Sequence, residues 1–252
     1  MLSPVPTIQL FGPPSVLVNQ QPLTRYHSQL VAALIFRLAA TEEPQPRAAL
    51  AAQLWESVDA GKANTNLSKG LYHLPDVLKP FLVMNRATVS LHLPTAAVDT
   101  RTFSHLCHNA MAPAQERATH AAALVQAADL YRGEFLQGFC IEGADRFSEW
   151  VISERQRYRR LAIRAHDELL IHCIECQAHL QAIYHATALL ALDRTDEATY
   201  RQLMQLLVQH GQVDAAASVY RTCCQALQEV HGAAPSDETV SLATQLHLIS
   251  AG

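Results

Sequence analysis

The chain has 252 residues, of which 49% are hydrophobic and 17% are charged, and its formal net charge is −4. This length accommodates two domains with ordinary cores, and the composition excludes a disordered chain, which would be poorer in apolar residues. The small net charge gives no global sign of nucleic-acid binding, so any basic surface must be local.

Short strands and helices alternate at the start of the chain. Short apolar runs separated by turn residues predict strands at 7–11, 15–18 and 21–23. Apolar residues at helical spacing then predict one helix that begins near Arg25 and a second helix over 47–55.

A third helix and a hairpin follow. Leucines at helical spacing predict a helix from about Ala63, carried by Leu67, Leu71, Leu74 and Leu78. Residues 81–84 and 88–93 alternate in polarity, which predicts a β-hairpin with a two-residue Asn85-Arg86 turn, because Asn tolerates a positive φ. Three helices and a terminal hairpin form the plan of a winged helix-turn-helix, in which the third helix enters the major groove of DNA.

Helical patterns fill the rest of the chain. Asp99 is expected to cap a helix that carries Phe103, and Gly211 and Pro235 mark later helix ends and starts. The predicted helices cover about 121–131, 146–176, 179–192, 196–210, 213–230 and 237–249, with a glycine-containing connection at 131–139.

One helical unit occurs twice in the sequence. Ala182 and Ala216 lie 34 positions apart, which is the period of a tetratricopeptide helix pair, and small residues allow two helices to approach closely. We therefore predict a mainly α protein with a small β component: a winged helix-turn-helix over residues 1–96 and an all-α tetratricopeptide-like repeat domain over 97–252. A stack of helix pairs presents a concave surface to a partner.

Several segments together resemble the bacterial transcriptional activator domain of the Streptomyces antibiotic regulatory proteins and AfsR-like regulators. The segments that carry the resemblance are Leu10-Phe11-Gly12-Pro13, Leu54-Trp55, Asp99 with Phe103, Leu130 to Leu136 with Gly138, Glu197 with Met204, Gly211 with Ala216 and Tyr220, and Leu227, Glu229, Gly232, Pro235 and Ser236. The resemblance covers nearly the whole chain. It implies an OmpR-type winged helix that binds promoter repeats as a homodimer, and a helical domain that recruits RNA polymerase or another protein.

The stretch that would form the recognition helix carries few basic residues. Gly70 costs a helix about 1 kcal/mol relative to Ala, and Pro75 must end or bend it. The candidate DNA contacts, including the neighbouring wing, are Lys62, Asn66, Ser68, Lys69, Tyr72, His73, Lys79 and Arg86. The four cations among them fall short of the roughly six to ten phosphate contacts typical of strong binding, and a dimer would double their number.

Other clusters are interpreted as structural or as partner surfaces. Arg155, Arg157, Arg159, Arg160 and Arg164 form the most basic run, which is either a solvated, salt-bridged face or a surface for polymerase, a second protomer or flanking DNA. His172, Cys173, Cys176 and His179 lack the paired spacing of a zinc site, so we expect no metal and no cofactor. No motif in the sequence brings a nucleophile together with a base, so we expect that the protein is not an enzyme and has no catalytic residues.

Residues 1–6 lack the basic start and long apolar run of a secretory signal, and the apolar stretch near 31–40 is too short to span a bilayer. We therefore expect a cytoplasmic protein with no membrane attachment and with reduced cysteines. Two functions stay open: a DNA-binding transcriptional activator, and a protein-interaction or regulatory subunit of the same fold whose winged helix no longer binds DNA. A metal- or thiol-sensing regulator that uses Cys173 and Cys176 is a third, weaker hypothesis.

Overall fold

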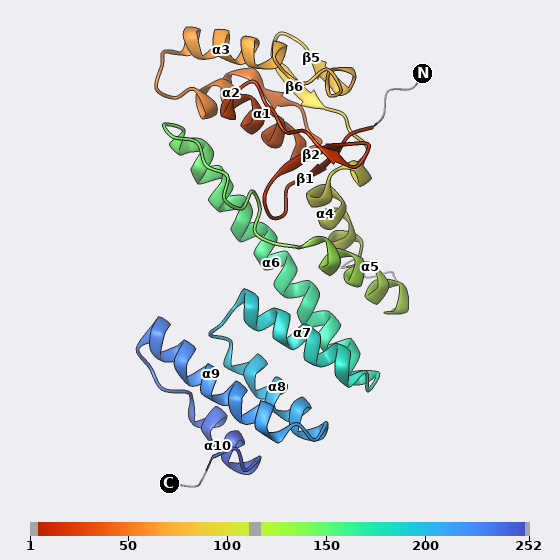
Figure 1. Ribbon diagram of the computed structural model, residues 1–252, viewed down its shortest axis with the longest axis vertical. Helices are drawn as coiled ribbons and strands as arrows, with labels where there is room; N and C mark the ends of the chain where they lie inside the picture. The colour runs from red at the N-terminus through yellow and green to blue at the C-terminus, as the bar shows by residue number, and fades with distance from the viewer. Residues whose placement is uncertain (1–4, 111–116, 250–252) are drawn as a thin grey trace. The chain divides into compact units, whose positions relative to one another are not determined.

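A computed structural model describes residues 5–110 and 117–249, and it is mainly helical with two small sheets (Figure 1). The chain forms two compact units. Unit 1 comprises residues 1–112 and 126–160, and unit 2 comprises residues 113–125 and 161–252. These units group residues by contact and each combines two segments of the chain, whereas the domains expected at 1–96 and 97–252 are continuous. The boundary between the expected domains stays a prediction.

Unit 1 begins with an antiparallel sheet of β1 (Thr7–Gln9), β2 (Ser15–Val18) and β3 (Gln21–Pro22), in that order. Ile8 lies opposite Val16 on the buried face of this sheet. Val18 lies opposite Gln21, and the two residues between them, Asn19 and Gln20, have φ of 52° and 65°. Two successive positive φ values fit the tight hairpin turn that follows the twist of the strands.

Three helices follow: α1 (Gln29–Ala39), α2 (Arg47–Leu54) and α3 (Ala60–Tyr72). Helix α1 begins later than expected, because the hydroxyl of Ser28 accepts the backbone N–H of Val31 and serves as its N-cap. A second antiparallel sheet, in the order β4-β6-β5, is built from β4 (Gln45–Pro46), β5 (Leu82–Met84) and β6 (Thr88–Leu91). Short 3₁₀ turns precede β5 at Lys79–Phe81 and precede α4 (Asp99–Ala110) at Thr95–Ala97.

Asp99 is the first residue of α4 rather than a cap residue before it. Its buried carboxylate accepts the backbone N–H of Thr100 at 2.7 Å and also those of Leu10 at 2.8 Å and Phe11 at 3.1 Å. Burial raises the pKa of the Asp99 carboxyl, and these three N–H groups offset part of the rise. Asp99 therefore ties the chain after β1 to the start of α4.

Arg101 is a second buried charge in unit 1. Its guanidinium donates to backbone carbonyls at the end of α1, on Leu38, Ala39 and Thr41, and to those of Leu91 and Leu93 after β6. Five carbonyls thus share one cation, which satisfies groups that burial would otherwise leave unpaired. The contacts connect segments that are about 60 positions apart in the chain.

The glycine-containing connection at 131–139 packs against the chain after β1 and pairs with it at one isolated β-bridge, between Phe11 and Phe135. The backbone N–H of Leu136 donates to the carbonyl of Leu10, and Gly12 donates to Glu134. A Cβ on Gly133 would lie 3.1 Å from the Cα of Gly12, which is too close for any larger residue without a shift of backbone. Aromatic rings then close the core around Phe11, whose ring centroid lies 5.1 Å from those of both Phe103 and Tyr158.

Unit 2 is built from helices alone in its described part. The helices α7 (His179–Leu192), α8 (Glu197–Gln209), α9 (Val213–His231) and α10 (Asp237–Gln245) follow one another, and α5 (Arg117–Leu130) and α6 (Asp145–Glu175) contribute residues to both units. Their bounds lie close to those expected, except that α10 ends at Gln245 rather than near 249.

Small residues allow the helices of unit 2 to pack closely. Ala182, Ala186 and Ala216 are fully buried among leucines and Met204. Gly211 has φ +75° after the end of α8, which confirms the expected left-handed cap. The two alanines of the 34-residue spacing therefore lie in one core cluster, as the repeat predicts.

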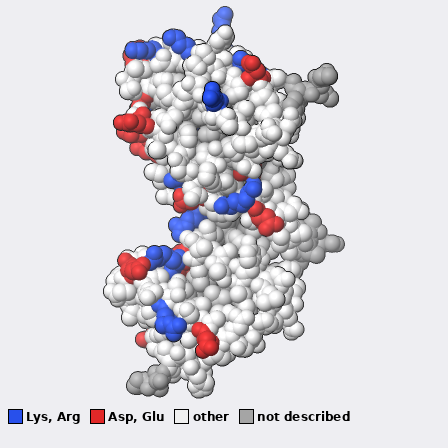
Figure 2. Space-filling model, viewed as in Figure 1, with Lys and Arg blue, Asp and Glu red and all other residues white. Residues whose placement is uncertain are grey.

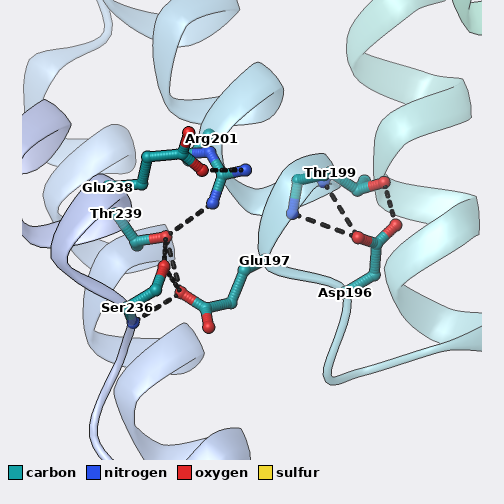
Figure 3. A network of polar contacts seen from close by, with 8 residues as sticks. Asp196, Glu197, Thr199, Arg201, Ser236, Glu238 and Thr239 are labelled. Carbon is teal, nitrogen blue, oxygen red and sulfur yellow. Dashed lines mark hydrogen bonds and ion pairs between the residues drawn. The ribbon is translucent and has the colours of Figure 1, made fainter.

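Polar contacts join α8 to α10 (Figure 3). The carboxylate of Glu197 accepts three hydrogen bonds. Two come from Ser236, from its backbone N–H at 2.9 Å and its hydroxyl at 2.7 Å, and the third comes from the hydroxyl of Thr239 at 2.6 Å. Burial alone would raise the pKa of Glu197, but the hydrogen bonds from Thr239 and Ser236, together with Arg201, leave it below its usual range. Ser236 is the N-cap residue of α10, as expected, yet its hydroxyl bonds to Glu197 instead of the helix backbone.

Candidate nucleic-acid interface

Helix α3 separates a buried side from an exposed side. Ala63, Leu67, Gly70 and Leu71 are buried, and the side chain of Asp59 accepts the backbone N–H of Lys62 to cap the helix. The exposed residues of α3 include these candidate DNA contacts: Lys62, Ser68, Lys69 and Tyr72. Asn66 is half-buried, whereas Asn64 and Thr65, which the sequence did not single out, are exposed.

Close packing explains why position 70 of α3 is a glycine. A Cβ at this position would lie 3.3 Å from Cη2 of Trp55 and 3.4 Å from Cδ2 of Leu34. The missing side chain lets α3 approach α1 and the end of α2 closely, which offsets the weak helix propensity of glycine.

The expected length of the third helix is wrong at both ends. Helix α3 begins at Ala60 and ends at Tyr72, so Leu74 and Leu78 lie after it, although both are buried. Pro75 disfavours helical backbone at the residue before it, so the helix stops short of Pro75 rather than bending. His73 is the C-cap, and its exposed ring stacks on that of His27 with centroids 3.7 Å apart.

The hairpin is present, but its turn differs from the expected one. Met84 lies opposite Val89, and the N–H of Asn85 donates to the carbonyl of Thr88. Among the described residues, Asn85 is not one of those with a positive φ; its side-chain oxygen instead accepts the N–H groups of Ala87 and Thr88. Arg86 is therefore exposed at the tip of the hairpin, in an Asn-stabilised turn.

Strand β5 lies beside the exposed side of α3 (Figure 1). The groove between them has a volume of about 550 Å³, and it is lined by Arg47, Ser68, Leu71, Tyr72, Lys79, Leu82 and Met84. Arg47, the first residue of α2, donates from Nη2 to Oγ of Ser68 at 2.9 Å. Sequence reasoning missed Arg47, because its place beside α3 depends on tertiary packing across 21 positions.

Cations around the groove are few and partly paired. Nζ of Lys79 lies 2.7 Å from the carboxylate of Asp76 and 5.6 Å from the ring centroid of Tyr72. The hydrogen bond and the positive charge from Lys79 lower the pKa of Asp76, so that carboxylate stays charged at neutral pH. Lys and Arg side chains are also widely spaced over the face drawn in Figure 2.

The arginine run lies on α6, and two of its members have internal roles. Arg155 donates to the carbonyls of Phe135 and Leu136, both at 2.8 Å. Arg157 donates to Glu154 at 2.9 Å, and its guanidinium carbon lies 4.2 Å from the ring centroid of Tyr158. The other three arginines are exposed: Arg159, Arg160 and Arg164. A partner surface would thus depend mainly on these three.

The residues that suggested a metal site do not form one in the described part of the chain, where no group of three or more His, Cys, Asp or Glu side chains could hold an ion. Cys173 is buried, and the Cys176 sulfur lies 3.8 Å from Nε2 of His172. None of the helices in the described ranges combines the length and the apolar character needed to cross a bilayer.

Together, consecutively packed helices and a three-helix unit with an adjoining hairpin define a mainly α protein with two small sheets. Residues 98–247 match the family model of the bacterial transcriptional activator domain, and the chain belongs to that family. The solved structure of Mycobacterium tuberculosis EmbR in complex with a low-affinity phosphopeptide has a similar fold, with a TM-score of 0.67 and 18% identity; the similarity covers 96% of this chain and 65% of that one. The chain therefore spans just under two thirds of the EmbR structure. No curated protein matches the sequence.

Proposed function

We propose that the chain is a DNA-binding transcriptional activator whose unit 1 contains an OmpR-type winged helix. The observation that carries the proposal is the hairpin β5–β6 beside the exposed side of α3, with Arg47 and Lys79 at the groove, Lys69 exposed on α3 and Arg86 at the hairpin tip. A helix with a flanking hairpin is the arrangement that winged helices use on duplex DNA. Membership of the activator-domain family supports the same function.

The proposed docking places α3 in the major groove. Lys62, Lys69, Lys79 and Arg86 would neutralise phosphates, and Arg47 adds a fifth cation. Each neutralised phosphate makes the slope of log affinity against log salt steeper by about 0.9, so a monomer with five such contacts would show a slope of about −4.5. A homodimer on two half-sites would roughly double that slope, which fits the expectation that the protein acts as a dimer.

The helical part is proposed to contact RNA polymerase or another protein. Arg159, Arg160 and Arg164 are three exposed cations of α6 that an acidic partner segment could meet. This role needs no cofactor and no catalysis. A protein that activates transcription in a bacterium would act in the cytoplasm.

Salt titration of DNA binding tests the proposal. Fluorescence anisotropy with a duplex of promoter length should show affinity that falls steeply between about 50 and 200 mM salt. Lys69→Ala should reduce the slope by about one, because it removes one phosphate contact. Arg221→Ala, which removes an exposed cation from α9, should leave the slope unchanged.

The alternative function is a protein-interaction or regulatory subunit of the same fold. The apolar lining of the groove by Leu71, Tyr72, Leu82 and Met84, and the pairing of Lys79 with Asp76, favour it. Absent or salt-independent DNA binding would support this alternative and reject the activator.

A further inference from the structure

The groove between α3 and β5 has an apolar lining and cations among its lining residues. Tyr72 is 75% exposed and Met84 is 58% exposed, although both are large hydrophobic side chains. Exposed apolar side chains that cluster in one groove mark a contact surface for a ligand or partner. We propose that this groove reads thymine through its 5-methyl group, an inference that rests on the proposed DNA-binding function.

Three polar side chains of α3 already donate hydrogen bonds to the backbone of the helix. The hydroxyl of Thr65 donates to the carbonyl of Gly61, and that of Ser68 donates to Asn64, each at 3.0 Å. The amide of Asn64 donates to Ala60 at 2.9 Å. These bonds to the preceding turn use donors that would otherwise reach base edges.

Ser68 is also occupied as an acceptor. Its oxygen receives the 2.9 Å hydrogen bond from Arg47, which fixes that guanidinium at the wall of the groove. A contact that needs no hydrogen bond would add sequence discrimination that these side chains do not supply.

Thymine supplies such a contact. In the major groove each base pair offers donors and acceptors, and thymine alone among the four bases adds an apolar methyl group. The ring of Tyr72 stands at the last position of α3, and Leu82 and Met84 face it from β5 across the groove. A methyl group that enters between them loses contact with water and packs on carbon atoms, which is favourable.

The charges fit the same occupant. Arg47 and Lys79 line the groove, and Lys69 is exposed one turn before His73, the C-cap of α3. The carboxylate of Asp76 lies beside these cations and pairs with Lys79. Duplex DNA that contains thymine offers phosphates to these cations and methyl groups to the apolar surface beside them.

A methyl-deletion experiment tests the inference. A preferred duplex is selected from a randomised pool with the full-length chain and is then resynthesised with deoxyuridine in place of thymidine, which removes the methyl groups alone. The wild-type chain should bind the deoxyuridine duplex about fourfold more weakly for each methyl that it buries.

Variants separate this contact from phosphate binding. Tyr72→Ala should bind the two duplexes equally, whereas Tyr72→Phe, which keeps the ring, should retain the wild-type preference. Lys69→Ala should weaken binding to both duplexes by the same factor and leave their ratio unchanged. Circular dichroism of each variant confirms that the helices are intact.

The outcomes distinguish this inference from the function on which it rests. Salt-dependent binding that is equal for the two duplexes, or a preference that survives Tyr72→Ala, would overturn thymine reading and leave DNA binding in place. Failure to enrich any duplex would reject both, and would point to a protein segment as the occupant of the groove.

Discussion

Each of the two units of this chain is stabilised internally by a different kind of interaction. Unit 1 relies on buried charges and aromatic rings that join distant segments, such as Asp99 to Leu10 and Arg101 to Ala39. All seven phenylalanines and both tryptophans lie at or before Trp150. Unit 2 packs consecutive helices through alanines and leucines, and its contacts are mostly between sequence neighbours. A unit with polar cross-links should be sensitive to the loss of single polar atoms, and a repeat-like unit to changes in side-chain volume.

The most destabilising change should be Arg101→Met. It leaves up to five buried carbonyls without their donor and should lower the free energy of unfolding of unit 1 by about 3–5 kcal/mol. Urea unfolding followed by tryptophan fluorescence reports unit 1 directly, since both tryptophans lie there. Arg86→Met at the hairpin tip is the matched control and should change stability by less than about 0.5 kcal/mol.

The corresponding volume test in unit 2 is Ala216→Leu. Ala216 is fully buried between helices, so three added carbons should cost about 2–3 kcal/mol through overpacking. Hydrogen–deuterium exchange should show faster exchange in α7 to α9 and unchanged exchange in β1 to β6. Ala233→Leu, at an exposed position, should have no such effect. Loss of protection in both units together would contradict the division into separately stabilised units.

A pH test concerns the buried pair His166 and His185 in unit 2, whose Nδ1 atoms lie 3.1 Å apart. Burial and the neighbouring His185 lower the pKa of His166 to about 4, whereas the unfolded chain should titrate near 6.5. The native state then binds fewer protons, so stability is full above about pH 6.5 and falls as the pH drops towards 4, by about 3 kcal/mol at pH 4.

Exchange measurements on α6 and α7 at pH 7 and pH 4.5 would reveal this loss. His166→Leu should flatten the pH dependence, while His231→Gln at an exposed site should retain it. A pH dependence that persists in His166→Leu would assign the effect to other groups.

The smallest expected effect is that of Glu197→Ala, which removes the acceptor joining α8 to α10. The N–H and the hydroxyl of Ser236 are exposed and can turn to water, and the buried hydroxyl of Thr239 keeps a second partner in the hydroxyl of Ser236, so the cost should be about 1 kcal/mol. Exchange protection should fall in α10 and stay unchanged in α7. Glu175→Ala serves as a control that leaves this network intact.

Local patterns predicted helices better than they predicted connections. The helices α7, α8 and α9 were expected within a residue or two, because their signals lie in apolar periodicity and in Gly211. The third helix was extended wrongly through Leu74, because buried leucines continue at helical spacing after the backbone has left the helix. Burial alone therefore does not locate a helix end.

The candidate interface was predicted in part. The exposed positions of Lys62, Lys69, Tyr72 and Arg86 agree with what a DNA contact requires, though their binding role stays a prediction. The place of Arg47 beside Ser68 and the structural use of Arg155 could not be read from the sequence, because both depend on partners about 20 positions away.

The stretch Tyr131 to Leu136 supports unit 1 largely through its backbone. Its N–H and carbonyl groups pair with Leu10 and Gly12, and Gly133 leaves room for that approach. Because these contacts use backbone atoms, the exposed side chains of Arg132 and Glu134 can vary while the pairing persists, whereas position 133 is restricted to the smallest residue.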